Sequence, residues 1–289
     1  LLKEREWARI SIVEASHFNA GTAYVAANRF QMDDQQPYLF KTTDFGKTWT
    51  RIDQSGAAHG IPATEFTRVI REDEVRPGLL FAGTERGIFV SLDDGATWTS
   101  LRKNLPIVPV HDLAIKEGDL IAATHGRSFY VIDDISVLRQ ISAPVINAKA
   151  HLFAPRPSYR INWGGGFQIG APTSPVGQNP PNGAIVYYWL KDGAKRVTIE
   201  FRDSTGRTVR SFSSDTAGTT PGAAPTGRRG VAADAPPSAK VGLNTFSWNL
   251  READATTFPG MIMWAGVTTG PLVLPGNYSV RLLVDGQQA

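Results

Sequence analysis

The amino-acid sequence predicts an all-β chain, and three observations support that prediction. The 289 residues include 28 glycines and 19 prolines, and 42% of the chain is apolar. The apolar runs are short and alternate with turn residues, which is typical of many strands joined by turns. One eight-residue template also recurs, as TTDFGKTW at Thr42–Trp49 and SLDDGATW at Ser91–Trp98, each flanked by strand-like runs.

The first half of the chain repeats a unit of four strand-like runs. In the second unit they are FTRVIRE, GLLFAGTE, GIFVSLDD and GATWTSL, spanning Phe66–Leu101. The first unit has the same order, and the third lacks the Gly and Trp of the template. Four strands at a period of about 40–50 residues are the signature of β-propeller blades. Residues 1–142 are therefore predicted to form about three four-stranded blades, and because three blades cannot close a ring, we expect upstream propeller blades in the parent chain as partners.

The second half alternates in the same way but without the repeat. Residues 143–160 hold three prolines and are predicted to be a linker. Residues 161–289 contain runs such as AIVYYWLK (Ala184–Lys191) and RVTIEFRD (Arg196–Asp203), which predict a β-sandwich of the Ig-like type. Residues 214–240 are rich in Gly, Ala, Pro and Thr and are predicted to be a flexible inserted loop.

Each residue of the eight-residue template has a structural role in a turn. The Asp accepts hydrogen bonds from backbone N–H groups, the Gly supplies a positive φ, and the Trp packs between blades. A calcium loop would need more oxygen ligands at alternating positions than either stretch offers. We therefore interpret two sets of residues as structural turn locks: Thr42, Asp44, Gly46, Thr48 and Trp49 in the first, and Ser91, Asp93, Gly95, Thr97 and Trp98 in the second.

The template resembles the Asp-box, or BNR repeat, of sialidases, xyloglucan-hydrolysing glycoside hydrolases and sortilin-type receptors. THGRSFYVIDD (Thr124–Asp134) resembles a bacterial group of exported proteins described as sortilin-like or glycosyl-hydrolase-like. In that group a small Ig-like domain, similar to one in flagellar hook-capping proteins, follows the propeller. GLNTFSWNL (Gly242–Leu250) and LPGNYSVRLLVDG (Leu274–Gly286) resemble that domain. The resemblance implies a secreted or periplasmic parent protein.

The loops between the second and third strands of each unit lie on the face opposite the Asp-box turns, if those turns join strands three and four as the resemblance implies. These loops converge on the propeller mouth, where propellers bind ligands. Their charges of both signs suit a polar ligand, although loop tips are polar in any protein and fit a bracing role as well. The candidate ligand-binding residues are Arg29, Asp33, Asp34, Glu85, Arg86, His125 and Arg127.

The favoured function is that of a non-catalytic exported propeller protein that binds a peptide or a glycan at its mouth. One alternative is a xyloglucanase-like glycoside hydrolase, which needs two carboxyls across the scissile bond. Asp33, Asp34 and Glu85 are the acids available for it, with the rest of the site in missing blades. A second alternative is a structural interaction module. No HExxH, Walker or GxGxxG motif occurs, so no catalytic residue and no cofactor is assigned.

Composition argues against several other classes of function. The chain has no cysteine, which rules out disulfides and thiolate metal ligands, and no metal site is predicted. The formal net charge is +3 and the basic residues are scattered, which does not fit a nucleic-acid partner. No apolar run reaches the roughly 18 residues typical of a membrane-spanning helix.

Overall fold

The computed structural model describes residues 6–54, 58–160, 181, 183–215, 235–256, 258, 261 and 268–289. Its described regular elements are strands, apart from η1 (Phe30–Met32), α1 (Ser136–Gln140) and α2 (Ala143–Asn147). The prediction of an all-β chain is confirmed. None of the described helices has the length and hydropathy needed to cross a membrane.

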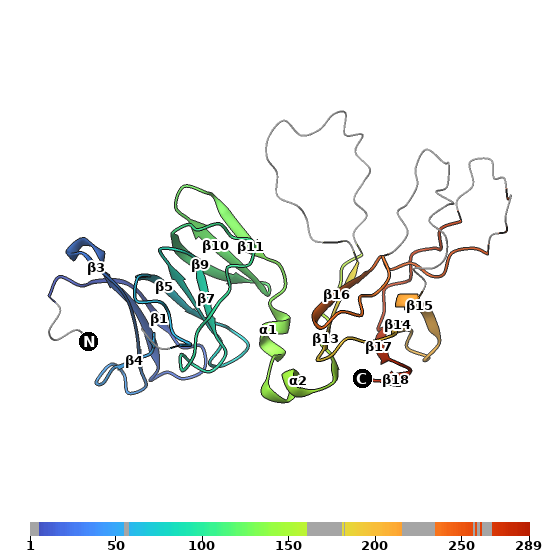
Figure 1. Cartoon of the computed structure of the whole chain (residues 1–289), viewed down its shortest axis with the longest axis horizontal. Coiled ribbons are helices and arrows are strands. Elements are labelled where there is room, and N and C mark those ends of the chain that lie inside the picture. Colours follow the sequence, from blue (N-terminus) through green and yellow to red (C-terminus); the bar gives the residue numbers. More distant parts are fainter. Residues whose placement is uncertain are drawn as a thin grey trace, which may run out of the picture. The chain divides into compact units, whose positions relative to one another are not determined.

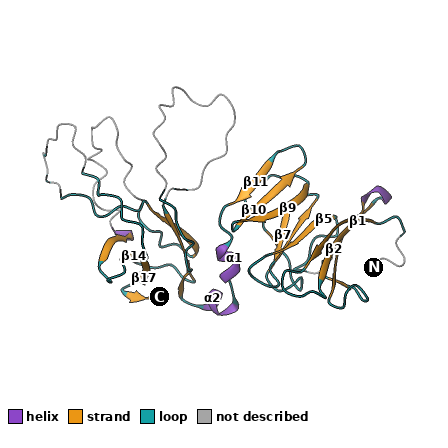
Figure 2. Ribbon diagram, turned by 180° about the vertical axis from the view of Figure 1, so that it is seen from behind, coloured by secondary structure: helices purple, strands orange, loops and turns teal. Residues whose placement is uncertain are grey.

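The chain divides into two compact units, residues 1–139 and 140–289 (Figures 1 and 2). The boundary lies three residues before the end of the predicted first domain at residue 142. Each unit has its own hydrophobic core among the described residues.

The first unit contains three antiparallel sheets in which chain neighbours pair in up-and-down order. Sheet 1 consists of β1 (Arg9–Ala15), β2 (Ala23–Arg29), β3 (Asp34–Thr42) and β4 (Thr50–Arg51). Sheet 2 consists of β5 (Thr67–Glu72), β6 (Leu80–Thr84), β7 (Ile88–Ser91) and β8 (Thr99–Ser100). Sheet 3 consists of β9 (Val110–Lys116), β10 (Asp119–Thr124) and β11 (Phe129–Ile132).

The three sheets are stacked face to face, with sheet 2 in the middle. Ile70 of β5 packs into a core shared with Tyr24 and Leu39 of sheet 1. Its neighbour Val69 packs into a second core, shared with Leu113 of sheet 3. Because adjacent side chains of a strand point to opposite faces, both faces of sheet 2 are covered. This explains why every residue of β6 and β7 is buried.

Sheet 3 differs from the prediction of four strands per unit, since three strands are found in its described part. After Ile132 the chain turns into α1 instead of a fourth strand. The stretch VIDDIS lacks the Gly and the Trp that build the other two turns. Ile135 and Val137 are 1% and 5% exposed, and Ile135 belongs to the core shared with sheet 2, so the turn into α1 buries the apolar side chains instead.

The second unit consists of two antiparallel sheets around one core. The first sheet has the order β12 (Ala150–Leu152), β13 (Ala184–Leu190), β16 (Gly242–Trp248). The second has the order β15 (Thr208–Ser213), β14 (Val197–Arg202), β17 (Ser279–Val284), β18 (Gln287–Gln288). Trp248 of the first sheet stacks on Phe201 of the second, with ring centroids 4.3 Å apart.

The stretch predicted to be a linker, residues 143–160, contains regular elements. It contains α2, and its strand β12 pairs antiparallel with β13, so it supplies an edge strand of the second unit. The alternation that signals a strand cannot be recognised in a run of only three residues. Most of the predicted inserted loop, at residues 216–234, and residues 161–180 of the predicted second domain lie outside the described residues.

Candidate functional site

The first template stretch forms a closed turn between β3 and β4. The Asp44 carboxylate accepts hydrogen bonds from the hydroxyls of Thr42 and Thr48, at 2.8 and 2.7 Å, and from the Thr48 backbone N–H at 2.9 Å. Gly46, at a φ of 82°, donates its N–H to the Thr42 hydroxyl at 2.9 Å. These contacts hold the carboxylate inside its own turn.

The second template stretch repeats this geometry between β7 and β8. Asp93 accepts hydrogen bonds from the hydroxyls of Ser91 and Thr97, at 2.8 and 2.6 Å, and from the Thr97 N–H at 2.8 Å. Gly95, at a φ of 87°, donates to the Ser91 hydroxyl at 2.8 Å. Trp98 then enters the core between sheets 1 and 2 and donates its indole N–H to the Ile52 carbonyl at 2.6 Å.

These hydrogen bonds lower the pKa of both carboxyls below the ordinary value of 3.8. For Asp44 the largest cause is the bond from the Thr48 hydroxyl. For Asp93 burial acts in the opposite direction, and the bonds from Thr97 and Ser91 outweigh it. A carboxyl whose pKa is lower in the folded state stabilises the fold above its unfolded pKa and loses that contribution as the pH falls through the folded value.

We therefore expect acid to weaken the first unit through these two turns. The urea midpoint of unfolding should fall as the pH is lowered from about 5 to about 2, and the double variant Asp44→Asn with Asp93→Asn should show a flatter pH dependence. Asp192→Asn, at an exposed carboxyl of the second unit, serves as the control, and its urea midpoint should depend on pH as that of the wild type does. If the urea midpoint of the double variant also depends on pH as the wild type does, the stabilising role of the two carboxylates is contradicted.

The template turns and the candidate ligand-binding loops lie at opposite ends of the sheets. The backbone N–H of Phe45, in the first template, donates to the carbonyl of Gly21 in the β1–β2 connection, at 3.0 Å. The backbone N–H of Asp94, in the second template, donates in the same way to the carbonyl of Gly78 in the β5–β6 connection, at 2.9 Å. In an up-and-down sheet, the connection between the second and third strands lies at the opposite end. We call that end the mouth face, made of the turns at residues 30–33, 85–87 and 125–128 with the first residues of β1, β5 and β9.

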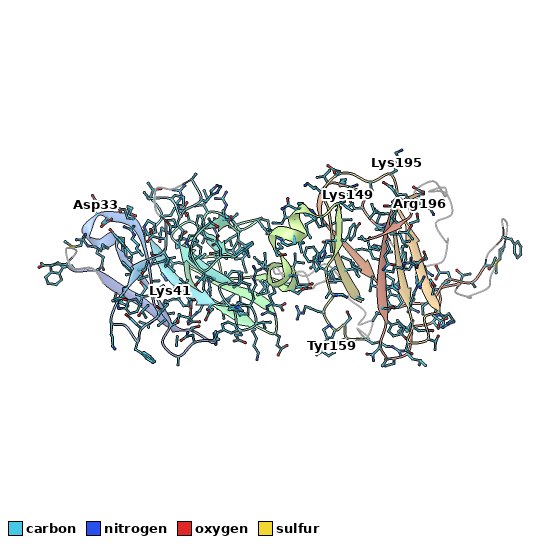
Figure 3. All side chains as sticks on the ribbon, turned by 90° about the horizontal axis from the view of Figure 1, so that it is seen from below. Asp33, Lys41, Lys149, Tyr159, Lys195 and Arg196 are labelled. Carbon is cyan, nitrogen blue, oxygen red and sulfur yellow. The ribbon has the colours of Figure 1, made fainter. Side chains whose placement is uncertain are left out.

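On sheet 1, two of the predicted residues bind each other. The Arg29 guanidinium lies 3.2 Å from the Asp34 carboxylate, which also accepts a hydrogen bond from the Tyr38 hydroxyl at 2.7 Å. Asp33 follows η1 in the left-handed conformation, with a φ of 56°, and its side chain lies exposed at the outer margin of the unit (Figure 3). Arg29 and Asp34 thus brace the β2–β3 connection, and Asp33 faces solvent.

On sheet 2, Glu85 holds an arginine that the sequence reasoning missed. Arg68 donates from two nitrogens to one Glu85 oxygen, at 2.9 and 2.6 Å. Its guanidinium also lies over the rings of Phe30 and Phe66, 5.4 and 4.8 Å from their centroids. These two rings stack on each other at 4.8 Å. Arg86, the other predicted residue of this turn, is exposed.

On sheet 3, His125 forms a stacked pair with a second missed residue. The imidazoles of His111 and His125 lie 4.9 Å apart at an interplanar angle of 18°. His111 stands near the start of β9, and His125 lies in the β10–β11 turn. The backbone N–H of His125 donates to the Pro109 carbonyl at 2.9 Å. Both histidines and Arg127 are exposed.

Arg68 and His111 occupy corresponding positions, at an irregularity that recurs in the first strand of each sheet. The pairing of β1, β5 and β9 with their neighbours shifts register at Ser11, Arg68 and His111 respectively. A β-bulge of this kind re-aims one side chain, which is why bulges are frequent beside functional sites. Alignment of FTRVIRE with PVHDLAIKE would have revealed the two basic residues, although the bulges themselves cannot be recognised in the sequence.

The charges around His111 lower its pKa below the ordinary value of 6.5. Burial is the largest cause, and the positive charges of Arg68, His125 and Arg9 act in the same direction. Glu85 opposes them and is outweighed. Cations therefore dominate the electrostatic surroundings of this imidazole.

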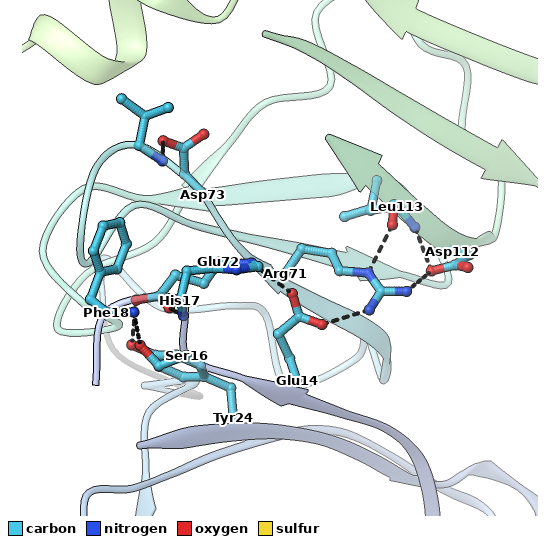
Figure 4. Close-up of polar contacts among 11 residues, drawn as sticks. Glu14, Ser16, His17, Phe18, Tyr24, Arg71, Glu72, Asp73, Asp112 and Leu113 are labelled. Carbon is cyan, nitrogen blue, oxygen red and sulfur yellow. Dashed lines mark hydrogen bonds and ion pairs between the residues drawn. The ribbon is translucent and has the colours of Figure 1, made fainter. Parts of the chain in front are cut away.

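Three residues after Arg68 on β5, Arg71 ties all three sheets together (Figure 4). It binds the Glu14 carboxylate of β1 at 2.6 Å, and on β9 the Asp112 carboxylate and the Leu113 carbonyl, both at 2.8 Å. Because this one side chain joins β1, β5 and β9, it fixes the three strands that carry Ser11, Arg68 and His111 relative to one another.

A second buried network lies beside this clamp. The Glu72 carboxylate accepts hydrogen bonds from the His17 backbone N–H at 2.9 Å and from the Tyr24 hydroxyl at 3.2 Å. The single hydrogen of this hydroxyl is shared between Glu72 and Asp94, whose carboxylate oxygen lies 2.9 Å away. Burial and the bond to Asp94 raise the pKa of Tyr24 well above its usual value, so this phenol stays protonated. Among the described residues no group of three or more His, Cys, Asp or Glu side chains is arranged to hold a metal ion.

Comparison with known proteins gave the following findings. No model of a known protein family matches the chain, and no curated protein matches it. Among solved structures, YCF48 bound to D1 peptide is 18% identical, with a TM-score of 0.33, over 46% of this chain and 39% of that one. The GH74 xyloglucanase from Xanthomonas campestris is 16% identical, with a TM-score of 0.33, over 50% of this chain and 25% of the enzyme. The chain thus spans well under half the length of either protein.

Proposed function

We propose that this chain is a non-catalytic ligand-binding module whose mouth face binds a peptide or a glycan. The observation that carries the proposal is the convergence of side chains from all three sheets on that face. Phe30 comes from sheet 1, Arg68 and Glu85 come from sheet 2, and His111 and His125 come from sheet 3. Ligand sites combine apolar contacts with a few placed polar groups in this way.

The carboxylates of the mouth face fit binding better than hydrolysis. Of the three candidate acids, Asp34 is engaged by Arg29 and Tyr38 and Glu85 by Arg68, which leaves Asp33 alone exposed to solvent. A glycosidase needs one carboxyl as a proton donor and a second that is available as a base or nucleophile. Acids held in ion pairs and hydrogen bonds on their own sheets are poorly suited to these roles.

The same proposal includes the wider architecture. The three stacked sheets are taken as blades of a larger Asp-box propeller of the sortilin-like kind, joined to further blades of the parent chain. The second unit is taken as an Ig-like spacer, and the parent protein as secreted or periplasmic. The up-and-down sheets, the closed turns of Asp44 and Asp93 and the two-sheet core around Trp248 support this view.

The test is a screen of the purified chain against a peptide library and a glycan array, followed by Arg68→Ala. We expect this variant to weaken binding of any ligand found by about thirtyfold, as is typical of a central arginine contact. Arg68→Lys keeps the charge but loses the two-nitrogen contact with Glu85, and should give an intermediate loss.

Arg207→Ala is the matched control, because Arg207 is an exposed arginine of the second unit that pairs with Asp203 at 3.0 Å. It should bind as the wild type does, and thermal melts should show that each variant is folded. Equal binding by wild type and Arg68→Ala would contradict the proposed site. Release of reducing ends from xyloglucan that disappears in Asp33→Ala with Asp34→Ala would contradict the non-catalytic assignment.

A further inference from the structure

We propose that the bulge residues of β1, β5 and β9 form a proton-sensitive site for the carboxylates of an acidic peptide, in which Arg68 is the permanent charge and His111 the switchable one. This inference rests on the proposed function and specifies the ligand of the same face. The recurring bulges at Ser11, Arg68 and His111 carry it.

The three bulges are adjacent and linked. The Asn28 side-chain amide donates to the Ser11 hydroxyl at 2.6 Å and to the Thr67 carbonyl, next to Arg68, at 3.3 Å. Because the Ser11 oxygen accepts a hydrogen bond, its own hydrogen remains a donor. The charge of Arg68 acts on His111 across the β5–β9 contact. Three adjacent strands thus present a row of three groups at corresponding bulge positions: a hydroxyl, a guanidinium that is paired with Glu85, and an imidazole.

Arg68 is paired with Glu85, and Arg9 adds a second positive charge, so the balance around this row still favours an anion. Protonation of His111 is opposed by three neighbouring basic groups: Arg68 of β5, Arg9 of β1 and His125 of the β10–β11 turn. The acid that faces it is Glu85 of the β6–β7 turn. Asp112, the next residue of β9, is engaged by Arg71 at 2.8 Å. A ligand carboxylate placed here would offset the cations and satisfy the donors.

Binding and protonation of His111 are therefore coupled. Burial and neighbouring cations hold the pKa of the free imidazole below 6.5, so it is largely neutral near pH 7. A bound carboxylate favours the protonated form and raises that pKa. By linkage the ligand then binds more tightly as the pH falls, for as long as its own carboxylates stay ionised.

The aromatic arrangement favours a peptide over a sugar. Sugar rings stack on aromatic rings whose faces are open to solvent. Phe30 and Phe66 stack on each other, Arg68 covers both, and Phe66 is only 3% exposed. The two phenylalanines thus serve to hold Arg68 in place, and the exposed group of this row is the imidazole of His111.

The experiment measures binding of two fluorescein-labelled decapeptides, one of alternating Glu and Gly and one of alternating Gln and Gly, by fluorescence anisotropy. We expect the Glu peptide to bind about three- to tenfold more tightly at about pH 5.5 than at about pH 7.5, since its carboxyls stay ionised over that range. The Gln peptide should show no such change. His111→Gln should reduce the pH ratio to below about twofold and leave binding at the higher pH nearly unchanged.

His17→Gln is the matched control, because His17 follows the opposite end of β1, 3.8 Å from Glu14, and should keep the full pH ratio. A pH ratio that persists in His111→Gln, or is absent from the wild type, would overturn the proton coupling. If an oligogalacturonate binds more tightly than the Glu peptide, the proposed ligand class, an acidic peptide, is wrong and an acidic glycan takes its place. If a ligand from the screen binds through Arg68 while the Glu peptide does not bind, this inference fails and the proposed function stands; if nothing binds, both fail.

Discussion

Replacing Trp98 with Ala is expected to lower the free energy of unfolding of the first unit by about 3–5 kcal/mol. The indole is 3% exposed and belongs to the core between sheets 1 and 2. Its N–H donates to the Ile52 carbonyl of the neighbouring sheet at 2.6 Å. The variant loses this packing, leaves a cavity, and leaves a backbone carbonyl without its partner. Urea denaturation followed by circular dichroism measures the change.

Trp49→Ala is the matched control, because the same template places this tryptophan in a different environment. Trp49 is half-buried against Tyr38 and Phe40, and its indole N–H binds the Gly46 carbonyl of its own turn at 3.0 Å. We expect a loss of about 1 kcal/mol. Equal losses in the two variants would contradict the view that Trp98 joins sheet 1 to sheet 2 while Trp49 packs within sheet 1 alone.

Replacing Trp248 with Ala is expected to destabilise the second unit by a similar amount, about 3–5 kcal/mol. Trp248 is 1% exposed and stacks on Phe201 of the facing sheet, and its indole N–H binds the Arg251 carbonyl at 2.9 Å. Since the described cores of the two units share no residue, the loss should be confined to the second unit. Scanning calorimetry should show one transition lowered and the other unchanged.

Tyr159→Ala serves as the control for Trp248, because it removes an aromatic ring of the same unit that is 81% exposed. It should change the free energy of unfolding by less than about 0.5 kcal/mol. A shift of both transitions in Trp248→Ala would show that the two units unfold together, which would contradict their separation into two cores.

The strand pattern of the first unit was predictable because each strand is short, apolar and bounded by turn residues. The runs ending at Asp44 and Asp93 were placed correctly as strands followed by closed turns. The third unit was predicted less well, because the loss of the Gly and Trp signals a changed turn but does not specify α1. Strand β12 was not predicted, because three residues are too few to show the alternation of apolar and polar side chains that indicates a strand.

The sequence predicted the loops that join the second and third strands, but not the strand residues that these loops contact. His125 and Glu85 stand in the predicted loops, and each contacts a partner that the loops do not contain. Those partners, His111 and Arg68, belong to strands that were assigned to the core by their apolar neighbours. A bulge changes the direction of a single side chain, and this depends on the pairing of two strands, which a local sequence pattern does not specify.

The sequence by itself determined the all-β class, the repeat and the chemistry of the two template turns, because turn-forming residues and strand periodicity act over a few neighbouring positions. Only the tertiary structure decided that Trp98 is buried between two sheets while Trp49 is only half-buried, and that Arg68 and His111 both stand at the mouth face. These outcomes depend on contacts between strands that are 40 or more positions apart in the chain, such as the bond from Trp98 to Ile52. Their physical cause is the stacking of one sheet on the next, which no single stretch of the sequence contains.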